Sequence, residues 1–492
     1  MNYNHKIILL VFLFLLLGGI STFSIFKERA ENRESSVERN EASIWLTTGD
    51  QKNLLTQKSP LPFSKIKEKN IQTITIDRET KYQTMDGFGA AITGSSAYLI
   101  NNKLNQSSKE MLLKDLFSAN GIHISYVRHS IGGSDFSVDD KGNASSYTYA
   151  DEEDISLSRF SVDKDQEVIN VLLEARSQNQ NLKIMGTPWT APSWMKYGEK
   201  TFNGWYLDYT TEETYKAYAD YFVRYIKSYE EKGLPIDSIT IQNEPDFTSP
   251  NYPTMSMSAE EQAVFIGKYL GPALESNKID TKIIAYDHNW EGASEFISTV
   301  LQHEDANKYT EGAAFHCYKG TPESMTRVHA NFPDKHIYLS ECSGGEWSED
   351  FGDNLSWQMS NLIIGGPRNW AKSVLMWNMA LDEKGGPTNG GCENCRGVVT
   401  INQETGKVTM NVEYYSIGHA SKFVQAGAIR IASTSFPGII ETIAYENLDH
   451  STVLIALNPS DNETRFQVND RGSFFTYTLP PKSAVTFIWE MK

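Results

Sequence analysis

The chain has 492 residues, of which 40% are hydrophobic and 12% aromatic, and its formal net charge is −17. This length suits one large domain and a smaller one, and the ordinary apolar content excludes a disordered chain or a polytopic membrane protein. Because phosphate contacts need clustered Lys and Arg, and no basic run occurs, the acidic balance argues against a nucleic-acid partner.

The N-terminus carries a nearly unbroken apolar run behind Lys6, and no charged residue follows until Lys27. Such a run is typical of a secretory signal, although no Ala-x-Ala cleavage site follows it. As a helix, residues 7–26 would measure roughly 30 Å, enough to cross a bilayer. We therefore expect residues 1–26 to be a signal peptide or an N-terminal membrane anchor, and residues 27–42 a polar tether. Either alternative predicts an extracellular protein, secreted or anchored at the outer face of the cell membrane.

Residues 85–425 alternate between short apolar strands and longer helical patterns. The strands are expected at residues 87–92, 122–128, 182–186, 238–242, 282–286, 312–316, 336–340 and 373–377. Eight strands alternating with helices predict an α/β fold of the (β/α)8 type, a TIM barrel. A doubly wound sheet is the alternative, but Gly87-Phe-Gly89 does not continue into the glycine-rich motif of dinucleotide-binding folds.

The two ends of the chain have the sequence pattern of a β-domain, with short strands separated by turns. Residues 43–84 contain two expected strands, at 43–47 and 73–77. Residues 426–492 contain six, at 428–433, 439–445, 452–457, 466–468, 474–479 and 484–489. Six short strands alone make a thin sandwich, so we expect the N-terminal strands to complete a smaller β-sandwich built from both chain ends. Support of the barrel is its favoured role, and carbohydrate binding is the alternative.

Two glutamates follow barrel strands at the end where barrel enzymes place their chemistry. Glu244 follows the fourth expected strand and Glu341 the seventh, so both can point into one mouth. Cleavage of a glycosidic bond needs one carboxyl group to donate a proton and a second to attack or to activate water. The pair therefore predicts glycoside hydrolysis, with Glu244 as acid/base and Glu341 as nucleophile of a retaining mechanism.

Other polar residues at the strand ends fit the same chemistry. Asn243 is placed to hold a sugar 2-hydroxyl, and Arg128 to keep Glu341 ionised. Glu244 would need a raised pKa to carry a proton while Glu341 is charged. His316 is expected to shape the pocket through hydrogen bonds, and no cofactor or metal ion is expected.

Four cysteines occur in the chain. Cys392 and Cys395 form a C-x-x-C, but a zinc site needs a second ligand pair. Cys317 and Cys342 lie far upstream in strand-like segments and suggest no such pair. Outside the cytoplasm, a small disulfide loop between Cys392 and Cys395 is favoured over free thiols.

An ordered set of motifs resembles glycoside hydrolase family 30, which includes glucosylceramidases, β-1,6-glucanases and some xylan-active enzymes. The motifs are Met85-Asp-Gly-Phe-Gly-Ala-Ala-Ile-Thr93, Val127-Arg-His-Ser-Ile-Gly-Gly-Ser-Asp-Phe136, Thr187-Pro-Trp-Thr-Ala-Pro-Ser-Trp-Met195, Gln242-Asn-Glu-Pro245, Ala314-Phe-His-Cys-Tyr318, Leu339-Ser-Glu341 and Trp377-Asn-Met-Ala-Leu-Asp382. The resemblance implies the same two catalytic glutamates, and it implies Arg128 as support for the nucleophile. It implies that the cleaved sugar is bound by Asp135, Trp189, Asn243, Tyr318 and Trp377.

The substrate is less closely defined than the chemistry. The resemblance implies a β-linked glucoside, oligosaccharide or glycolipid, with a glucosylceramide-like glucoside and a β-1,6-glucan as the main candidates and a β-xyloside or xylan as the third. The segments 128–130 and 390–397 depart from the glucosylceramidase pattern, which weighs against ceramide as the leaving group. A catalytically silent carbohydrate-binding surface protein is the alternative of a different class.

Overall fold

The computed structural model describes residues 41–198 and 200–490. The expected signal or anchor segment and most of the expected tether lie outside the described residues. No helix within the described ranges is both long enough and apolar enough to cross a membrane.

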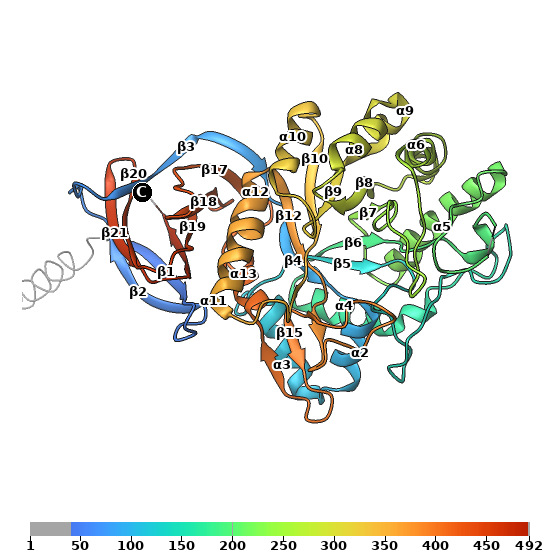
Figure 1. Ribbon diagram of the computed structural model, residues 1–492, viewed down its shortest axis with the longest axis horizontal. Coiled ribbons are helices and arrows are strands. Elements are labelled where there is room, and N and C mark those ends of the chain that lie inside the picture. The colour runs from blue at the N-terminus through green and yellow to red at the C-terminus, as the bar shows by residue number, and fades with distance from the viewer. Residues whose placement is uncertain (1–40, 199, 491–492) are drawn as a thin grey trace, which may run out of the picture.

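A closed barrel of eight parallel strands forms the larger part of the molecule (Figure 1). Its strands are β4 (Gly87–Ala91), β5 (Tyr126–Ser130), β6 (Lys183–Thr187), β7 (Ser238–Thr240), β8 (Lys282–Asn289), β9 (Thr310–His316), β10 (His336–Glu341) and β12 (Ala371–Met376). Each coincides with one of the eight expected strands, so the TIM-barrel prediction is confirmed. Closure also rules out the doubly wound sheet.

Helices follow the strands around the outside of the barrel. They are α2 (Gly94–Asn102), α3 (Gln106–Phe117), α4 (Gln166–Gln178), α5 (Glu212–Glu231), α6 (Ala259–Val264), α7 (Gly271–Ser276), α8 (Ala293–Gln302), α9 (Glu304–Tyr309), α10 (Glu323–Asn331), α11 (Phe351–Gln358), α12 (Gly365–Arg368) and α13 (Val412–Ser421). The π-helical segments Phe265–Leu270 and Met359–Ile364 join α6 to α7 and α11 to α12. In α5 the residues at helical spacing, Tyr218, Tyr221 and Phe222, are buried, as their periodicity predicts.

Strands from both chain ends form the second domain, a nearly closed mixed sheet. In sheet order they are β2 (Thr56–Pro62), β1 (Glu41–Thr47), β22 (Ser483–Trp489), β19 (Thr452–Asn458), β18 (Glu441–Glu446), β17 (Ile429–Ser433), β3 (Gln72–Thr84), β20 (Thr464–Asp470) and β21 (Ser473–Leu479). β1 pairs with β22, and β3 lies between β17 and β20, so the expected meeting of the chain ends is confirmed.

Strand β2 was not expected from the sequence. It is an edge strand with mostly exposed residues and with prolines at positions 60 and 62, so it lacks the apolar alternation of a half-buried strand.

Helices α11, α12 and α13 lie between the sheet and the barrel (Figure 1). The ring of Trp45 in β1 packs against Phe423 at a centroid distance of 4.5 Å. Buried His419 in α13 bridges the two end strands, with its ring nitrogens 2.8 Å from Thr47 Oγ1 and 2.9 Å from Thr486 Oγ1. Burial lowers the pKa of His419 to about 3, so its ring is neutral there. These contacts fix the sheet against the outside of the barrel.

Candidate active site

The predicted catalytic residues meet at the carboxyl ends of the barrel strands. Glu341 ends β10, His316 ends β9, and Glu244 follows β7. Arg128 lies near the end of β5, and Asp287 lies in β8. Because parallel strands direct their carboxyl ends to one face of the barrel, these five side chains converge on one mouth.

Arg128 is fully buried and distributes its hydrogen bonds over four strand ends. It donates to the Glu341 carboxylate, to Asn243 Oδ1 at 2.8 Å, to Asp287 Oδ2 at 2.9 Å and to Thr187 Oγ1 at 3.1 Å. Burial alone would lower the pKa of Arg128, but the charges of Asp287 and Glu341 raise it. Arg128 therefore holds a positive charge beside the proposed nucleophile. It also orients the Asn243 amide, whose oxygen faces Arg128 and whose NH2 group faces away.

Asp287 is the site residue whose function sequence reasoning missed. Its buried carboxylate accepts from Arg128, from His316 Nε2 at 3.1 Å, from Ser340 Oγ at 2.6 Å and from Thr240 Oγ1 at 2.6 Å. Although burial opposes ionisation, the charges of Arg128 and His316 hold the pKa of Asp287 well below its ordinary value. Asp287 is thus ionised and binds both Arg128 and His316. Nothing in one sequence links this aspartate to Arg128.

The two candidate catalytic carboxyl groups lie close together. An oxygen of Glu244 and an oxygen of Glu341 are within 4.8 Å of each other, and each is within 4.8 Å of a ring nitrogen of His316. Retaining glycosidases separate their carboxyl groups by about 5–5.5 Å, whereas inverting enzymes leave about 6.5–9.5 Å for a water molecule. A closest oxygen–oxygen approach within 4.8 Å fits the shorter of these two spacings.

Tyr318 completes the surroundings of Glu341. Its hydroxyl donates to Glu341 Oε1 at 2.8 Å, while Arg128 binds the other oxygen, Oε2. Both oxygens of Glu341 therefore have a fixed donor, which holds the carboxylate in one orientation. The family resemblance implies Arg128 as support for Glu341 and Tyr318 as a sugar-binding residue, and the structure places both side chains against Glu341.

His316 lies between the carboxylates and carries a charge. Burial disfavours that charge, but Glu341, Asp287 and Glu244 together raise the pKa of His316 to about 10. Its Nδ1 lies 3.3 Å from Glu244 Oε1, and its Nε2 donates to Asp287. Both ring nitrogens are thus donors to carboxylates, whereas a metal ligand would need a neutral ring with a free lone pair.

The expected raised pKa of Glu244 is wrong for the free protein. Burial does favour the neutral acid, but the hydrogen bond and the charge of His316 lower the pKa of Glu244. Glu244 and His316 are therefore linked by one hydrogen bond, and the charge of His316 favours the ionised form of Glu244. A motif places two carboxylates at one site, but it does not reveal a third titrating group between them.

Asp135 is the opposite case, a half-buried residue whose carboxyl group has no hydrogen bond from a cation. Burial, together with the charges of Glu341 and Glu244, raises the pKa of Asp135 well above its ordinary value. Its Oδ1 is buried and has no hydrogen-bond partner among the described residues. A neutral acid with an unpaired oxygen can exchange hydrogen bonds with a hydroxyl group of a bound sugar.

Trp189 and Trp377 stack on each other behind Arg128. Their ring centroids are 5.3 Å apart, and the Arg128 guanidinium lies 5.0 Å from the first ring and 5.6 Å from the second. The two side chains are only 2% and 4% exposed. They form a rigid aromatic wall of the site, to which Phe136 adds an edge-to-face contact with Trp377.

Both cysteine pairs form disulfides. Cys392 pairs with Cys395, as the spacing suggested. Cys317 pairs with Cys342, which the sequence analysis missed. These two residues directly follow His316 at the end of β9 and Glu341 at the end of β10, and the two strands are neighbours. Each of these cysteines lies just after the end of an expected strand, and this shared position was the available sequence signal for the pairing.

The Cys317–Cys342 disulfide should contribute strongly to stability. It closes a loop with a sequence separation of 25 residues, so replacing both residues with alanine should lower the free energy of unfolding by about 3 kcal/mol. Denaturant unfolding without and with a reductant measures this. Reduction should destabilise the wild type by a similar amount and the variant much less. A variant within about 1 kcal/mol of wild type would contradict the prediction.

The charge on His316 predicts a pH-dependent stability difference. A pKa raised from 6.5 to about 10 on folding contributes stability that is complete below about pH 6.5 and is lost as the pH rises through about 10. Replacing His316 with Gln should therefore lower the Tm more at pH 6 than at pH 9.5, by roughly twofold or more. The matched control is His450→Gln, whose side chain is 85% exposed. Equal losses at both pH values would show that His316 is uncharged.

Comparisons with known proteins agree with this geometry. Residues 85–424 match the model of the glycosyl hydrolase family 30 TIM-barrel domain, and residues 427–487 match that of the family 30 β-sandwich domain. An endo-1,6-β-D-glucanase of Aspergillus fumigatus is 35% identical, covering 82% of this chain and 85% of the relative. The lysosomal acid glucosylceramidase of Mus musculus is 28% identical, covering 85% of this chain and 83% of the relative.

A solved structure has the same architecture over nearly the whole chain. It is that of an endo-β1,6-glucanase, 32% identical in sequence, with a TM-score of 0.84 over 92% of this chain and 100% of the other. With both domains matched and the glutamates converging as described, the chain belongs to glycoside hydrolase family 30.

Proposed function

We propose that this family 30 hydrolase cleaves β-glucosidic bonds with retention of configuration, using Glu341 as nucleophile and Glu244 as acid/base. The observation that carries the proposal is the short spacing of the two carboxyl groups. The donors on both oxygens of Glu341 support the assignment of roles, because they orient that carboxylate for attack.

The reaction then proceeds in two displacements. In the first, a carboxylate oxygen of Glu341 attacks the anomeric carbon while Glu244 protonates the departing glycosidic oxygen, giving a glucosyl ester of Glu341. In the second, Glu244 takes a proton from water, and the resulting hydroxide attacks the same carbon and releases Glu341. Arg128 and Tyr318 stabilise the Glu341 carboxylate each time it reforms.

His316 supplies the proton in this scheme. The side chain of Glu244 is 18% exposed and lies within hydrogen-bond reach of His316 Nδ1. A sugar bound over Glu244 would displace the remaining water, and the loss of hydration favours the neutral form of a carboxyl group. The shared proton then moves from His316 to Glu244, where the leaving oxygen can accept it.

A β-1,6-glucan is the favoured substrate. The relatives at 32–35% identity are named endo-1,6-β-D-glucanases, whereas the glucosylceramidase of Mus musculus is 28% identical. A glucosylceramide-type glycolipid is the second candidate, supported by that last relative.

We further propose that the enzyme acts outside the cytoplasm, since two disulfides are typical of an oxidising compartment and residues 1–26 have the pattern of a signal or anchor.

Substitution of the two glutamates tests the roles separately. Glu341→Gln should reduce turnover of an aryl β-glucoside by about a thousandfold or more, because no nucleophile remains. Glu244→Gln should lose much less on a dinitrophenyl glucoside than on a glucan, because a good leaving group needs no proton.

The anomeric configuration of the first product tests the retaining mechanism. Proton NMR of the first turnovers should detect the β-anomer before mutarotation. Initial release of the α-anomer would contradict the retaining mechanism, and a Glu341→Gln variant with substantial activity would contradict the choice of nucleophile.

A further inference from the structure

The strongly exposed aromatic side chains of the described residues all lie around the catalytic end of the barrel. One group follows β6 and β7 and consists of Tyr197, Trp205, Tyr206, Tyr209 and Phe247. The other follows β9 and β10 and consists of Tyr318, Trp347 and Trp357. The closed strand order places β6 four strands from β10, so the two groups lie on opposite sides of the mouth.

A cavity of about 470 Å³ lies beside the second group. Tyr318, Trp347 and Trp357 line it, together with the first turns of α11. Tyr318 also donates its hydroxyl to Glu341, so one side chain is the wall between this cavity and the proposed nucleophile. A ligand chain that leaves the catalytic centre past Tyr318 would enter this cavity.

The lining combines aromatic faces with polar groups. Trp347 and Trp357 are 56% and 45% exposed, in contrast to the nearly buried Trp189 and Trp377. Asp353 and Ser348 stand at the same cavity, and Asp353 uses Oδ1 for its 2.6 Å ion pair with Lys482. A pyranose ring has the matching chemistry, with C–H faces for indole rings and hydroxyl groups for a carboxylate. A hydrocarbon chain would match the indole faces but would offer no hydrogen bonds to the polar groups.

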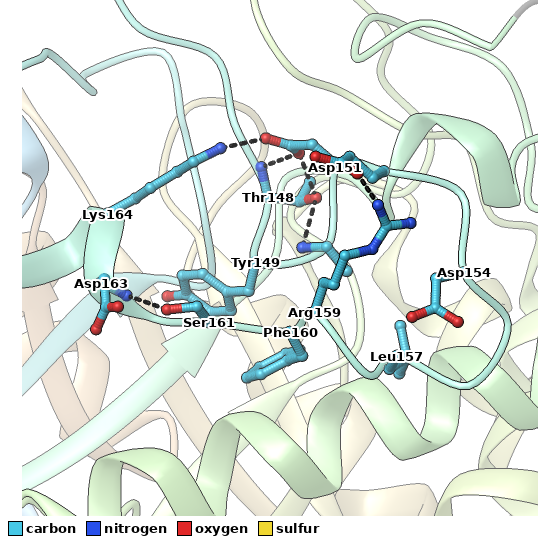
Figure 2. Close-up of a pocket in the computed structure, with 12 residues that line it drawn as sticks. Thr148, Tyr149, Asp151, Asp154, Leu157, Arg159, Phe160, Ser161, Asp163 and Lys164 are labelled. Carbon is cyan, nitrogen blue, oxygen red and sulfur yellow. Dashed lines mark hydrogen bonds and ion pairs between the residues drawn. The ribbon is translucent and has the colours of Figure 1, made fainter.

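A second cavity, of about 270 Å³, lacks this combination (Figure 2). It lies in the segment between β5 and α4, and three of its acidic groups already have partners within the segment. Asp151 pairs with Lys164, Glu152 with Arg159, and Asp154 accepts from Ser156 and Ser158. No strongly exposed aromatic side chain lines it.

We propose that the cavity between Tyr318, Trp347 and Trp357 is a second sugar subsite, which binds the glucosyl residue next to the one held over Glu341. This inference rests on the proposed function and deepens it, because a neighbouring subsite lets the enzyme act on a chain rather than on a single glucoside. The Trp357 indole provides the stacking face, and the Tyr318 ring separates the two sugar positions.

A pair of substrates tests the subsite. For each variant, kcat/KM is measured on a soluble 1,6-β-glucan and on 4-nitrophenyl β-glucoside, which has no second sugar for the cavity to bind. The ratio of the two values should fall about tenfold in Trp357→Ala, as expected for the loss of one stacking partner. Trp357→Phe keeps an aromatic face and should restore most of the ratio. Leu448→Ala, at a 67% exposed position of the sheet domain, should leave it unchanged.

The outcomes separate the subsite from the proposed function. Equal loss on both substrates, or an unchanged ratio in Trp357→Ala, would overturn the subsite while wild-type glucoside hydrolysis still supports the function. A selective loss on glucosylceramide in detergent micelles, with the glucan rate unchanged, would assign the cavity to an acyl chain and overturn the sugar assignment. A wild type that cleaves the aryl glucoside but not the glucan would also overturn it.

Discussion

The buried positive charge of Arg128 is the constraint on which the rest of the site depends. A guanidinium without access to water needs anionic partners, and here Asp287 and Glu341 provide them. Because Arg128, Asp287 and Glu341 belong to three different strands, β5, β8 and β10, these ion pairs depend on closure of the barrel. The same contacts orient the proposed nucleophile and fix the amide of Asn243. The hydrogen bonds that satisfy the buried charge of Arg128 are therefore the same ones that position the proposed catalytic groups.

A second charge, on His316, connects the two proposed catalytic groups. Asp287 serves both cations, so the site is a buried network of alternating charges rather than two isolated glutamates. In such a network a proton transfer between Glu244 and His316 leaves the total charge of the site unchanged. Asp135 lies outside the reach of either cation's hydrogen bonds and keeps its proton, which makes it a donor or acceptor for sugar hydroxyls.

The barrel was predictable from the sequence because its strands are short apolar runs separated by helical patterns, and the glutamates were predictable because they follow two of those strands. Strand β2 was not, since an exposed edge strand has no apolar alternation. The function of Asp287 and the Cys317–Cys342 pairing were missed because each joins residues of different strands, whose contacts depend on barrel closure.

The protonation states of the site residues also could not be predicted from the sequence. The lowered pKa of Glu244 depends on a distance of 3.3 Å to His316, which no motif specifies. The backbone of Glu244 and Asp287 takes positive φ angles of 46° and 74°, which residues other than glycine adopt rarely and which local preferences therefore do not predict. Such conformations persist where the surrounding contacts determine them, here at the ends of β7 and within β8.

The central claim is that Glu341 forms a covalent bond to the sugar. A 2-deoxy-2-fluoro-β-glucoside with a good leaving group tests it most directly, because the fluorine slows the second displacement and lets the glycosyl-enzyme accumulate. Mass spectrometry of a proteolytic digest should then detect one fluorosugar on the peptide that contains Glu341, and none in Glu341→Gln. Label on another residue, or continued hydrolysis of the reagent by an unlabelled enzyme, would contradict the account.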